Sequence, residues 1–165
     1  MLKQLMTLVI VALFSTYNFA EPSIRSLKWS DLRPTDKLRE IKIVLPDKYG
    51  SNLATKQVIT DASVIKALDG LYVRIPGYLV PITLDERQQA SEFLLVPYLG
   101  ACIHVPPPPP NQIVYIKSKM SISYEDTAKP YWVTGVLHVT PINNELAEAG
   151  YLLDGASLSP YMTEE

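Results

Sequence analysis

The sequence has few of the residues from which metal clusters and disulfide scaffolds are built. Cys102 is the single cysteine, and His104 and His138 are the two histidines, in 165 residues. One cysteine excludes an internal disulfide, and it excludes zinc sites that need two or more thiolates from one chain. Two histidines exclude a histidine-rich metal buffer. Any metal site here has to be sparse, or shared with a second chain.

A strong charge of one sign is also missing. The formal net charge is -2 and 19% of the residues are charged. This balance argues against a strongly basic nucleic-acid binder, so no nucleic-acid partner is expected. The 47% of hydrophobic residues can fill a packed core, which argues against global disorder. The length is that of one domain.

The sequence has one long apolar run, and it lies near the N-terminus. Lys3 precedes the run over residues 5–14, which is shorter than the roughly 20 residues of a membrane-spanning helix. We therefore expect residues 1–20 to be a signal peptide and residues 21–165 a single β-barrel-like domain without a transmembrane segment. An uncleaved N-terminal anchor is the alternative. No cysteine follows the run closely, so we expect a periplasmic protein that is not a lipoprotein.

Alternation of apolar and polar residues dominates the rest of the chain. It predicts strands over 41–45, 71–75, 78–82, 92–98, 102–105, 113–117, 131–139 and 150–154. A short helix is expected over 60–69, ended by Gly70, and a helical turn within 84–91. Gly77 indicates a bulge or a sharp bend. The fold class expected is mainly β: a small barrel of the oligonucleotide/oligosaccharide-binding (OB) type with one or two short helices.

Cys102 and His104 are two positions apart, and on an extended segment both side chains point to one side. A thiolate and an imidazole suit zinc, and copper is possible. Two ligands are too few for a tight site, so His138, an acidic residue, a second chain or water has to complete it.

The alternative is a small buried cysteine beside a hydrogen-bonded core histidine. A Cys–His nucleophile pair is a third interpretation, but no orienting residue or oxyanion loop can be assigned. An enzyme is therefore not expected.

A run of five prolines follows this pair. Proline favours a stiff polyproline II segment and cannot donate ladder hydrogen bonds. Such a segment can present a preordered surface to a partner, or it can act as a rigid connector across the mouth of the barrel. The candidate partner-binding residues are Pro106, Pro107, Pro108, Pro109, Pro110 and Asn111.

Around this motif the sequence resembles small exported bacterial proteins of a domain family of unknown function. The resemblance rests on Gly-x-Cys-Ile-His-x, a proline run and Asn-Gln, here Gly100 to Gln112. Further matching segments lie at 68–70, 73–78, 80–81, 93–98, 132–135 and 149–151. The resemblance implies an OB-like barrel, a periplasmic or lipoprotein location, and zinc-responsive operons that encode an ABC transporter of the macrolide-exporter type. It carries the metal hypothesis to Cys102 and His104, and His138 lies outside the motif.

The function expected is a periplasmic metal-binding accessory protein, with zinc as the expected metal, that acts with an ABC-type transporter in metal homeostasis. A homodimer is one way to complete its ligand set. The alternative is a non-metal adaptor that docks on a transporter through its barrel and its proline segment.

Overall fold

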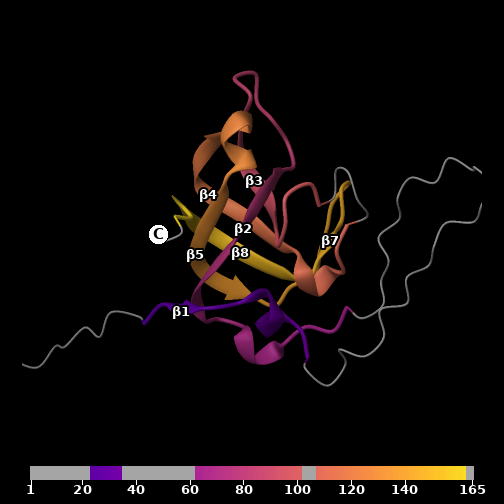
Figure 1. The fold of residues 1–165 in the computed structure, drawn as a ribbon. Coiled ribbons are helices and arrows are strands. Elements are labelled where there is room, and N and C mark those ends of the chain that lie inside the picture. Colours follow the sequence, from indigo (N-terminus) through magenta and orange to yellow (C-terminus); the bar gives the residue numbers. More distant parts are fainter. Residues whose placement is uncertain (1–22, 35–61, 102–106, 163–165) are drawn as a thin grey trace, which may run out of the picture.

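The computed structural model describes residues 23–34, 62–101 and 107–162, which form a small β-barrel with short 3-10 turns (Figure 1). The strands are β1 Arg25–Ser26, β2 Tyr72–Pro81, β3 Gln89–Val96, β4 Val114–Ser123, β5 Pro130–His138, β6 Ile142–Asn143, β7 Glu148–Ala149 and β8 Tyr151–Pro160. The 3-10 turns are η1 Trp29–Leu32, η3 Lys66–Leu68, η4 Pro110–Gln112 and η5 Tyr124–Ala128.

The strand pairing closes the barrel. The sheet runs in the order β1-β2-β3-β4-β8-β5, and β2 pairs with β5 again, so β2, β3, β4, β8 and β5 form a ring. The pair β4–β8 is parallel, whereas the other four pairs of the ring are antiparallel. This arrangement of five strands is that of an OB-type barrel, and it confirms the mainly β fold expected from the alternation.

Two apolar clusters lie on opposite faces of the barrel wall, because neighbouring residues of a strand point to opposite sides. On β3, Phe93 and Leu95 belong to the cluster inside the barrel, and Leu94 and Val96 to the one outside. We call the second one the outer cluster. Its buried members are Val80, Leu94, Val96, Ala101, Ile113, Tyr115, Ala147 and Ala149. The β6–β7 hairpin supplies two of these residues, so it covers part of the outside of the barrel.

The clearest predicted strand, expected over 131–139, is confirmed as β5 Pro130–His138, with each end one residue earlier. In β5 the side chains of Tyr131, Val133 and Leu137 are buried, while Trp132 and Thr134 are half-buried on the other face. Complete burial of one aliphatic side chain stabilises the fold by about 1.5–3 kcal/mol. A slip of the strand by one residue would expose these side chains, so their burial fixes the register.

Three local predictions are wrong. Among the described residues of 60–69 the structure has only the 3-10 turn at Lys66–Leu68, followed by Gly70 with φ of 75°. At Gly77 the predicted bulge is absent, because the register of β2 with β5 continues through Gly77 and Tyr78 without a shift. A Cβ at Gly77 would lie 2.7 Å from the Val96 carbonyl oxygen. Residues 84–91 contain a turn and the start of β3 rather than a helix, because the Asp85 carboxylate accepts hydrogen bonds from the backbone N–H groups of Arg87 and Gln89.

The strands β4 and β8 are longer than predicted. The strand expected at 113–117 continues to Ser123, and the one expected at 150–154 continues to Pro160. The predicted strands at 41–45 and 102–105 and the signal peptide at 1–20 lie outside the described residues.

Candidate functional site

The metal motif lies between two segments that the structure describes. Cys102, His104 and Pro106 fall outside the described residues, and the chain is described again from Pro107. On the N-terminal side, Gly100 has φ of 83° and Ala101 is fully buried in the outer cluster. The start of the motif is therefore anchored on the outside of the barrel.

The described prolines are packed against the protein. Pro108 and Pro110 are buried, whereas Pro107 and Pro109 are half-buried. The Pro109 carbonyl accepts a hydrogen bond of 2.8 Å from Gln112 N–H, and the Pro110 carbonyl accepts one of 2.7 Å from Gly150 N–H. The described part of the proline run thus ends in a turn that is bonded to the start of β8.

Two amide side chains after the prolines hold distant segments together. Asn111 is 2% exposed and donates from Nδ2 to the Ser63 carbonyl at 2.9 Å. Gln112 is 6% exposed and donates from Nε2 to the Trp29 carbonyl at 2.9 Å. Buried polar side chains need such partners. No sequence pattern predicts these contacts, because each partner lies far away along the chain. For Asn111, the role of partner contact stays a prediction.

His138 lies on the outside of the barrel. It belongs to a row of residues that are paired from strand to strand across the sheet, and this lateral row includes members of the outer cluster. Across neighbouring strands, Leu94 is paired with Tyr115, Tyr115 with Leu152, and Leu152 with His138. Paired residues point to the same face of a sheet, and neighbouring strands are about 4.8 Å apart. His138 is therefore two strands away from Tyr115, on the face that also holds Ala101.

His138 has an acidic neighbour. Its Nδ1 lies 4.0 Å from Oδ1 of Asp69, which also accepts a hydrogen bond of 2.9 Å from Val139 N–H. Both side chains are well exposed, at 43% for His138 and 61% for Asp69. Within the described residues no three His, Cys, Asp or Glu side chains come together as a metal-binding group. A site that uses His138 thus needs ligands from elsewhere.

The outer cluster contains one polar pair. Tyr115 donates its hydroxyl to Oε2 of Glu92 at 2.6 Å. Burial raises the pKa of Tyr115 to about 12, and the hydrogen bond and the negative charge of Glu92 add to the rise. The phenol is neutral at ordinary pH, so the pair acts as a fixed donor and acceptor within the barrel wall.

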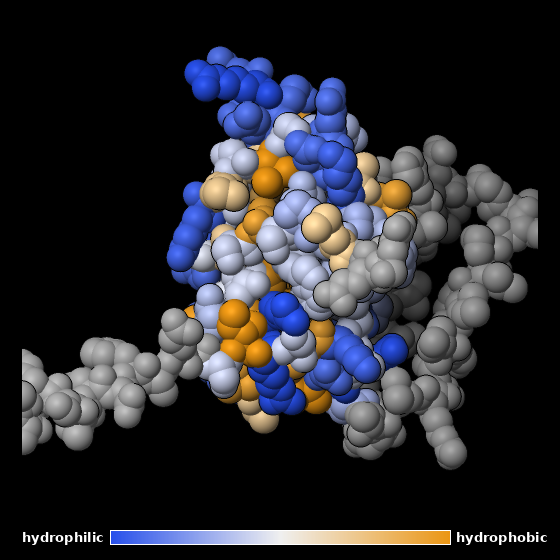
Figure 2. Space-filling view, turned by 60° about the vertical axis from the view of Figure 1, so that its left-hand side comes forward, coloured by the Kyte–Doolittle hydropathy of each residue, from blue (hydrophilic) through white to orange (hydrophobic). Residues whose placement is uncertain are grey.

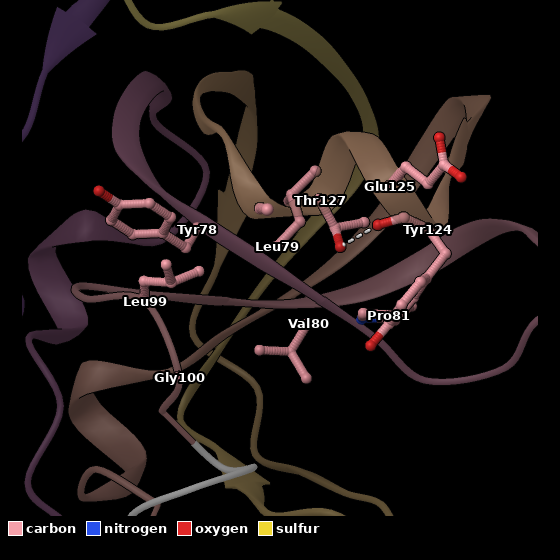
Figure 3. A pocket seen from close by; sticks show the side chains of 10 residues that line it. Tyr78, Leu79, Val80, Pro81, Leu99, Gly100, Tyr124, Glu125 and Thr127 are labelled. Carbon is pink, nitrogen blue, oxygen red and sulfur yellow. Dashed lines mark hydrogen bonds between the residues drawn. The ribbon is translucent and has the colours of Figure 1, made fainter.

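A pocket of about 340 Å³ lies between the end of β2, the turn η5 and the residues just before the metal motif (Figure 3). Tyr78 and Leu99 lie on one side of it and Tyr124 and Glu125 on the other (Figure 3). Its walls are mostly apolar. Neither composition nor motif pointed to this pocket, because it forms where three separate segments meet.

The surface around the barrel is mixed. Figure 2 shows hydrophobic residues in small separate patches along the middle of one face, with hydrophilic residues gathered above them. Among the large hydrophobic side chains, Leu99 is 60% exposed and Tyr124 is 51% exposed, and both line the pocket. Exposed apolar side chains around a pocket are typical of interaction sites.

The comparisons with known proteins identify the family. The family model of DUF3299, a protein family of unknown function, matches residues 29–160. The chain belongs to the DUF3299 family. The crystal structure of a DUF3299 family protein from Pseudomonas aeruginosa PAO1 is 40% identical in sequence and has a TM-score of 0.73, with 87% of this chain and 99% of that chain covered. No curated protein matches.

Membership in the DUF3299 family confirms the resemblance to a family of unknown function. Membership assigns neither a ligand nor a reaction to this chain. In the described part of this DUF3299 chain, no helix is both long enough and apolar enough to cross a membrane.

Proposed function

We propose that this DUF3299 protein is an exported, zinc-binding accessory protein of the periplasm that acts with an ABC-type transporter. The Cys102 thiolate and the His104 imidazole are the first two ligands of the site. Both are donors that zinc prefers, and copper accepts them as well. An oxidising compartment favours this use of a lone cysteine, because a bound metal protects the thiolate from oxidation.

The observation that carries the proposal is the shared outer face. Ala101, which directly precedes Cys102, is buried in the outer cluster, and His138 lies in the lateral row of Tyr115 and Leu152 on that face. The motif thus begins on the side of the barrel where His138, the second histidine of the sequence, lies. His138 is the third ligand in this proposal, and water or a second copy of the chain supplies the fourth.

A sparse site suits transfer of a metal better than storage. Zinc sites with an open position exchange that ligand readily, whereas structural sites are closed by four protein ligands. A partner protein can then offer its own ligand at the open position. The small number of cysteine and histidine residues therefore fits a role beside a transporter.

Zinc titration of the exported form tests the proposal. Wild type is compared with Cys102→Ser, His104→Ala and His138→Ala, and with the control Met120→Ala, whose side chain is 56% exposed on β4. We expect the two motif variants to lose at least about tenfold in zinc affinity and the control to retain it. Unchanged stoichiometry and affinity in both motif variants would end the metal proposal.

A non-metal adaptor is the second candidate, and the packing of the prolines favours it. Buried Pro108 and Pro110 fix the segment, while the half-buried Pro107 and Pro109 keep part of their rings accessible. A stiff segment loses little conformational freedom when it binds. Replacing Pro107 and Pro109 by alanine should then abolish capture of the transporter's exported part and leave zinc binding intact. If capture survives, the proline segment is not the docking surface.

A further inference from the structure

The central part of the outer face of β3 and β4 is covered in this barrel. OB barrels bind their ligands chiefly on the face of the second and third strands, which are β3 and β4 in the ring described above. On that face Leu94, Val96 and Tyr115 are buried in the outer cluster. A ligand of the barrel wall therefore needs a different face.

The outer face of β2, β5 and β8 carries hydroxyl groups and one cation. A row of paired residues crosses it from β1 to β8, in the order Ser26, Arg74, Thr134 and Ser157. The next row pairs Trp132 with Ser159. Paired residues point to the same side of a sheet, and all of these side chains are exposed or half-buried. This face thus offers polar groups in a regular array.

An aromatic pair and a hydrogen bond fix the position of the cation. The ring centroids of Trp132 and Tyr161 are 5.1 Å apart. The guanidinium carbon of Arg74 lies 4.6 Å from the centroid of the Trp132 ring, and its Nε donates to Ser26 Oγ at 2.6 Å. Stacking and the hydrogen bond together restrict the guanidinium, so it loses little further freedom when it binds a ligand.

The two terminal amino groups of this guanidinium have no acceptor in the described chain. Its printed hydrogen bond uses Nε alone, and the ion pairs among the described residues use other cations, Lys129 and His138. Arginine presents its N–H donors as a planar fork that matches the two oxygens of a carboxylate. The fixed fork of Arg74 is therefore complementary to a carboxylate from outside the chain.

The surroundings of Arg74 favour a sugar acid over a protein as the source of that carboxylate. Hot spots of protein interfaces combine arginine and aromatic residues with close packing, but serine and threonine are rare in them. Here three hydroxyls lie around the aromatic pair, on Thr134, Ser157 and Ser159. Among the large hydrophobic side chains of β2, β5 and β8, Val136 is the exposed one, at 36%. Such a face suits a ligand that itself carries many hydroxyls.

We infer that this face, which we name the arginine platform, binds an acidic oligosaccharide whose sugar rings carry carboxylates. The platform consists of Arg74, Trp132, Thr134, Ser157, Ser159 and Tyr161. Arg74 pairs with one carboxylate, and the accessible parts of the two aromatic rings contact the apolar face of a sugar ring. The serine and threonine hydroxyls exchange hydrogen bonds with the sugar hydroxyls. Zinc has no part in this binding, so the inference goes beyond the proposed function.

Trigalacturonic acid and its methyl ester are matched probes, because the ester keeps the sugar rings and removes the charges. Isothermal titration calorimetry of the exported protein at neutral pH, in a metal-free buffer, should show saturable binding of the acid with a Kd below about 5 mM. We expect the ester to bind at least about fivefold more weakly, because a hydrogen bond to a charged group is stronger than one to a neutral group. An end-capped triglutamate peptide carries carboxylates without sugar hydroxyls and should bind more weakly than the acid.

Variants of the cation separate its charge from its geometry. Arg74→Lys keeps the charge but loses the planar fork, and it should weaken binding of the acid about threefold to tenfold. Arg74→Gln should abolish the preference for the acid over the ester. Arg87→Gln, in the exposed turn before β3, is the matched control and should retain both the affinity and the preference.

Variants of the uncharged groups test the sugar itself. Tyr161→Ala should weaken binding about twofold to fivefold through lost ring contact, whereas Tyr124→Ala, at a tyrosine that is 51% exposed on η5, should leave it unchanged. Thr134→Val keeps the shape of the side chain and should weaken binding about twofold to fivefold through the lost hydroxyl. Circular dichroism checks that each variant is folded.

Four results would overturn the inference: no saturable binding of the acid up to about 10 mM, equal affinity of the acid and its ester, an Arg74→Gln variant that keeps the preference, or triglutamate that binds as tightly as the acid. The last result would identify an acidic protein segment as the ligand instead. Because the assay contains no metal and leaves Cys102 and His104 unchanged, its failure has no bearing on the zinc proposal. Loss of zinc binding in Cys102→Ser likewise has no bearing on the sugar titration.

Discussion

Tyr151 and Leu32 lie 119 positions apart and are joined by a hydrogen bond of 2.7 Å from the tyrosine hydroxyl to the leucine carbonyl. The same hydroxyl accepts a hydrogen bond of 2.7 Å from Ile65 N–H. Tyr151 is fully buried at the start of β8. One phenol thus ties the first turn of the described chain and the segment before η3 to the closing strand of the barrel.

Tyr151→Phe should lower the free energy of unfolding by about 1–3 kcal/mol. The substitution keeps the ring in place but leaves a buried carbonyl and the Ile65 N–H without their partner, and such groups carry their full desolvation penalty. Urea unfolding followed by circular dichroism measures the change. Tyr72→Phe is the control, because Tyr72 is half-buried on β2 and should change stability by less than about 0.5 kcal/mol. Equal effects of the two variants would contradict this role of the hydroxyl.

Gly150→Ala should also destabilise the protein, by about 1–3 kcal/mol, because overpacking displaces neighbouring atoms. A Cβ at Gly150 would lie 2.8 Å from Val64 Cγ1 and 2.9 Å from the Pro110 carbonyl oxygen. At Gly135 the nearest atoms would be 3.5 Å away, so Gly135→Ala should be close to neutral. Thermal unfolding of both variants makes the comparison. A Gly135→Ala variant that loses as much stability as Gly150→Ala would argue against close packing at the proline turn.

The ionisation of Tyr115 should occur well above that of an ordinary tyrosine. Its pKa of about 12 is raised by burial first, and then by the hydrogen bond and the charge of Glu92. Because the folded-state pKa lies above the ordinary tyrosine value of 10.0, the stabilisation is complete below pH 10 and is lost as the pH rises from 10 towards 12.

Glu92→Gln should shift this titration downwards but leave it above the ordinary value, since burial remains. The difference in ultraviolet absorbance between each protein and its Tyr115→Phe derivative isolates this one phenol among ten tyrosines. A titration that does not move in Glu92→Gln would show that the carboxylate has no part in the shift.

Arg74 lies over the ring of Trp132, with the guanidinium carbon 4.6 Å from the ring centroid. Its Nε also donates to Ser26 Oγ at 2.6 Å, which links β1 to β2. Exposed contacts of this kind contribute about 0.5–1 kcal/mol. Arg74→Ala should lower stability by this amount and change the tryptophan fluorescence. Arg87→Ala, in the exposed turn before β3, should do neither. Identical spectra of the Arg74 variant and wild type would contradict the stacking.

The sequence predicted those parts of the fold that depend on local alternation. In β5 the period of two is unbroken, and apolar burial on one face fixed both the strand and its orientation. The long-range partners of Tyr151 and Gln112 could not be predicted, because they depend on which strands become neighbours after the barrel closes. The bulge expected at Gly77 was wrong for the same reason: the small size of this residue permits close approach to Val96 of β3, a contact that the local sequence does not reveal.

The helix expected over 60–69 is missing from the described residues of that span for a physical reason. The spacing of a helix face is present in Val64, Ile65 and Leu68, but tertiary contacts replace the hydrogen bonds of a helix. The Ile65 N–H bonds to the Tyr151 hydroxyl rather than to a preceding carbonyl. A short helix is marginal without packing, so such contacts override its weak preference. The pocket beside η5 escaped prediction because no single segment forms it.

Native mass spectrometry of the freshly purified exported protein is the decisive test of zinc binding, because it reports bound metal and assembly state together. We expect a zinc-loaded species, as a monomer or a dimer, that disappears in Cys102→Ser and in His104→Ala but persists in Met120→Ala. A wild-type protein that stays metal-free after incubation with zinc, or variants that retain the metal as wild type does, would contradict it.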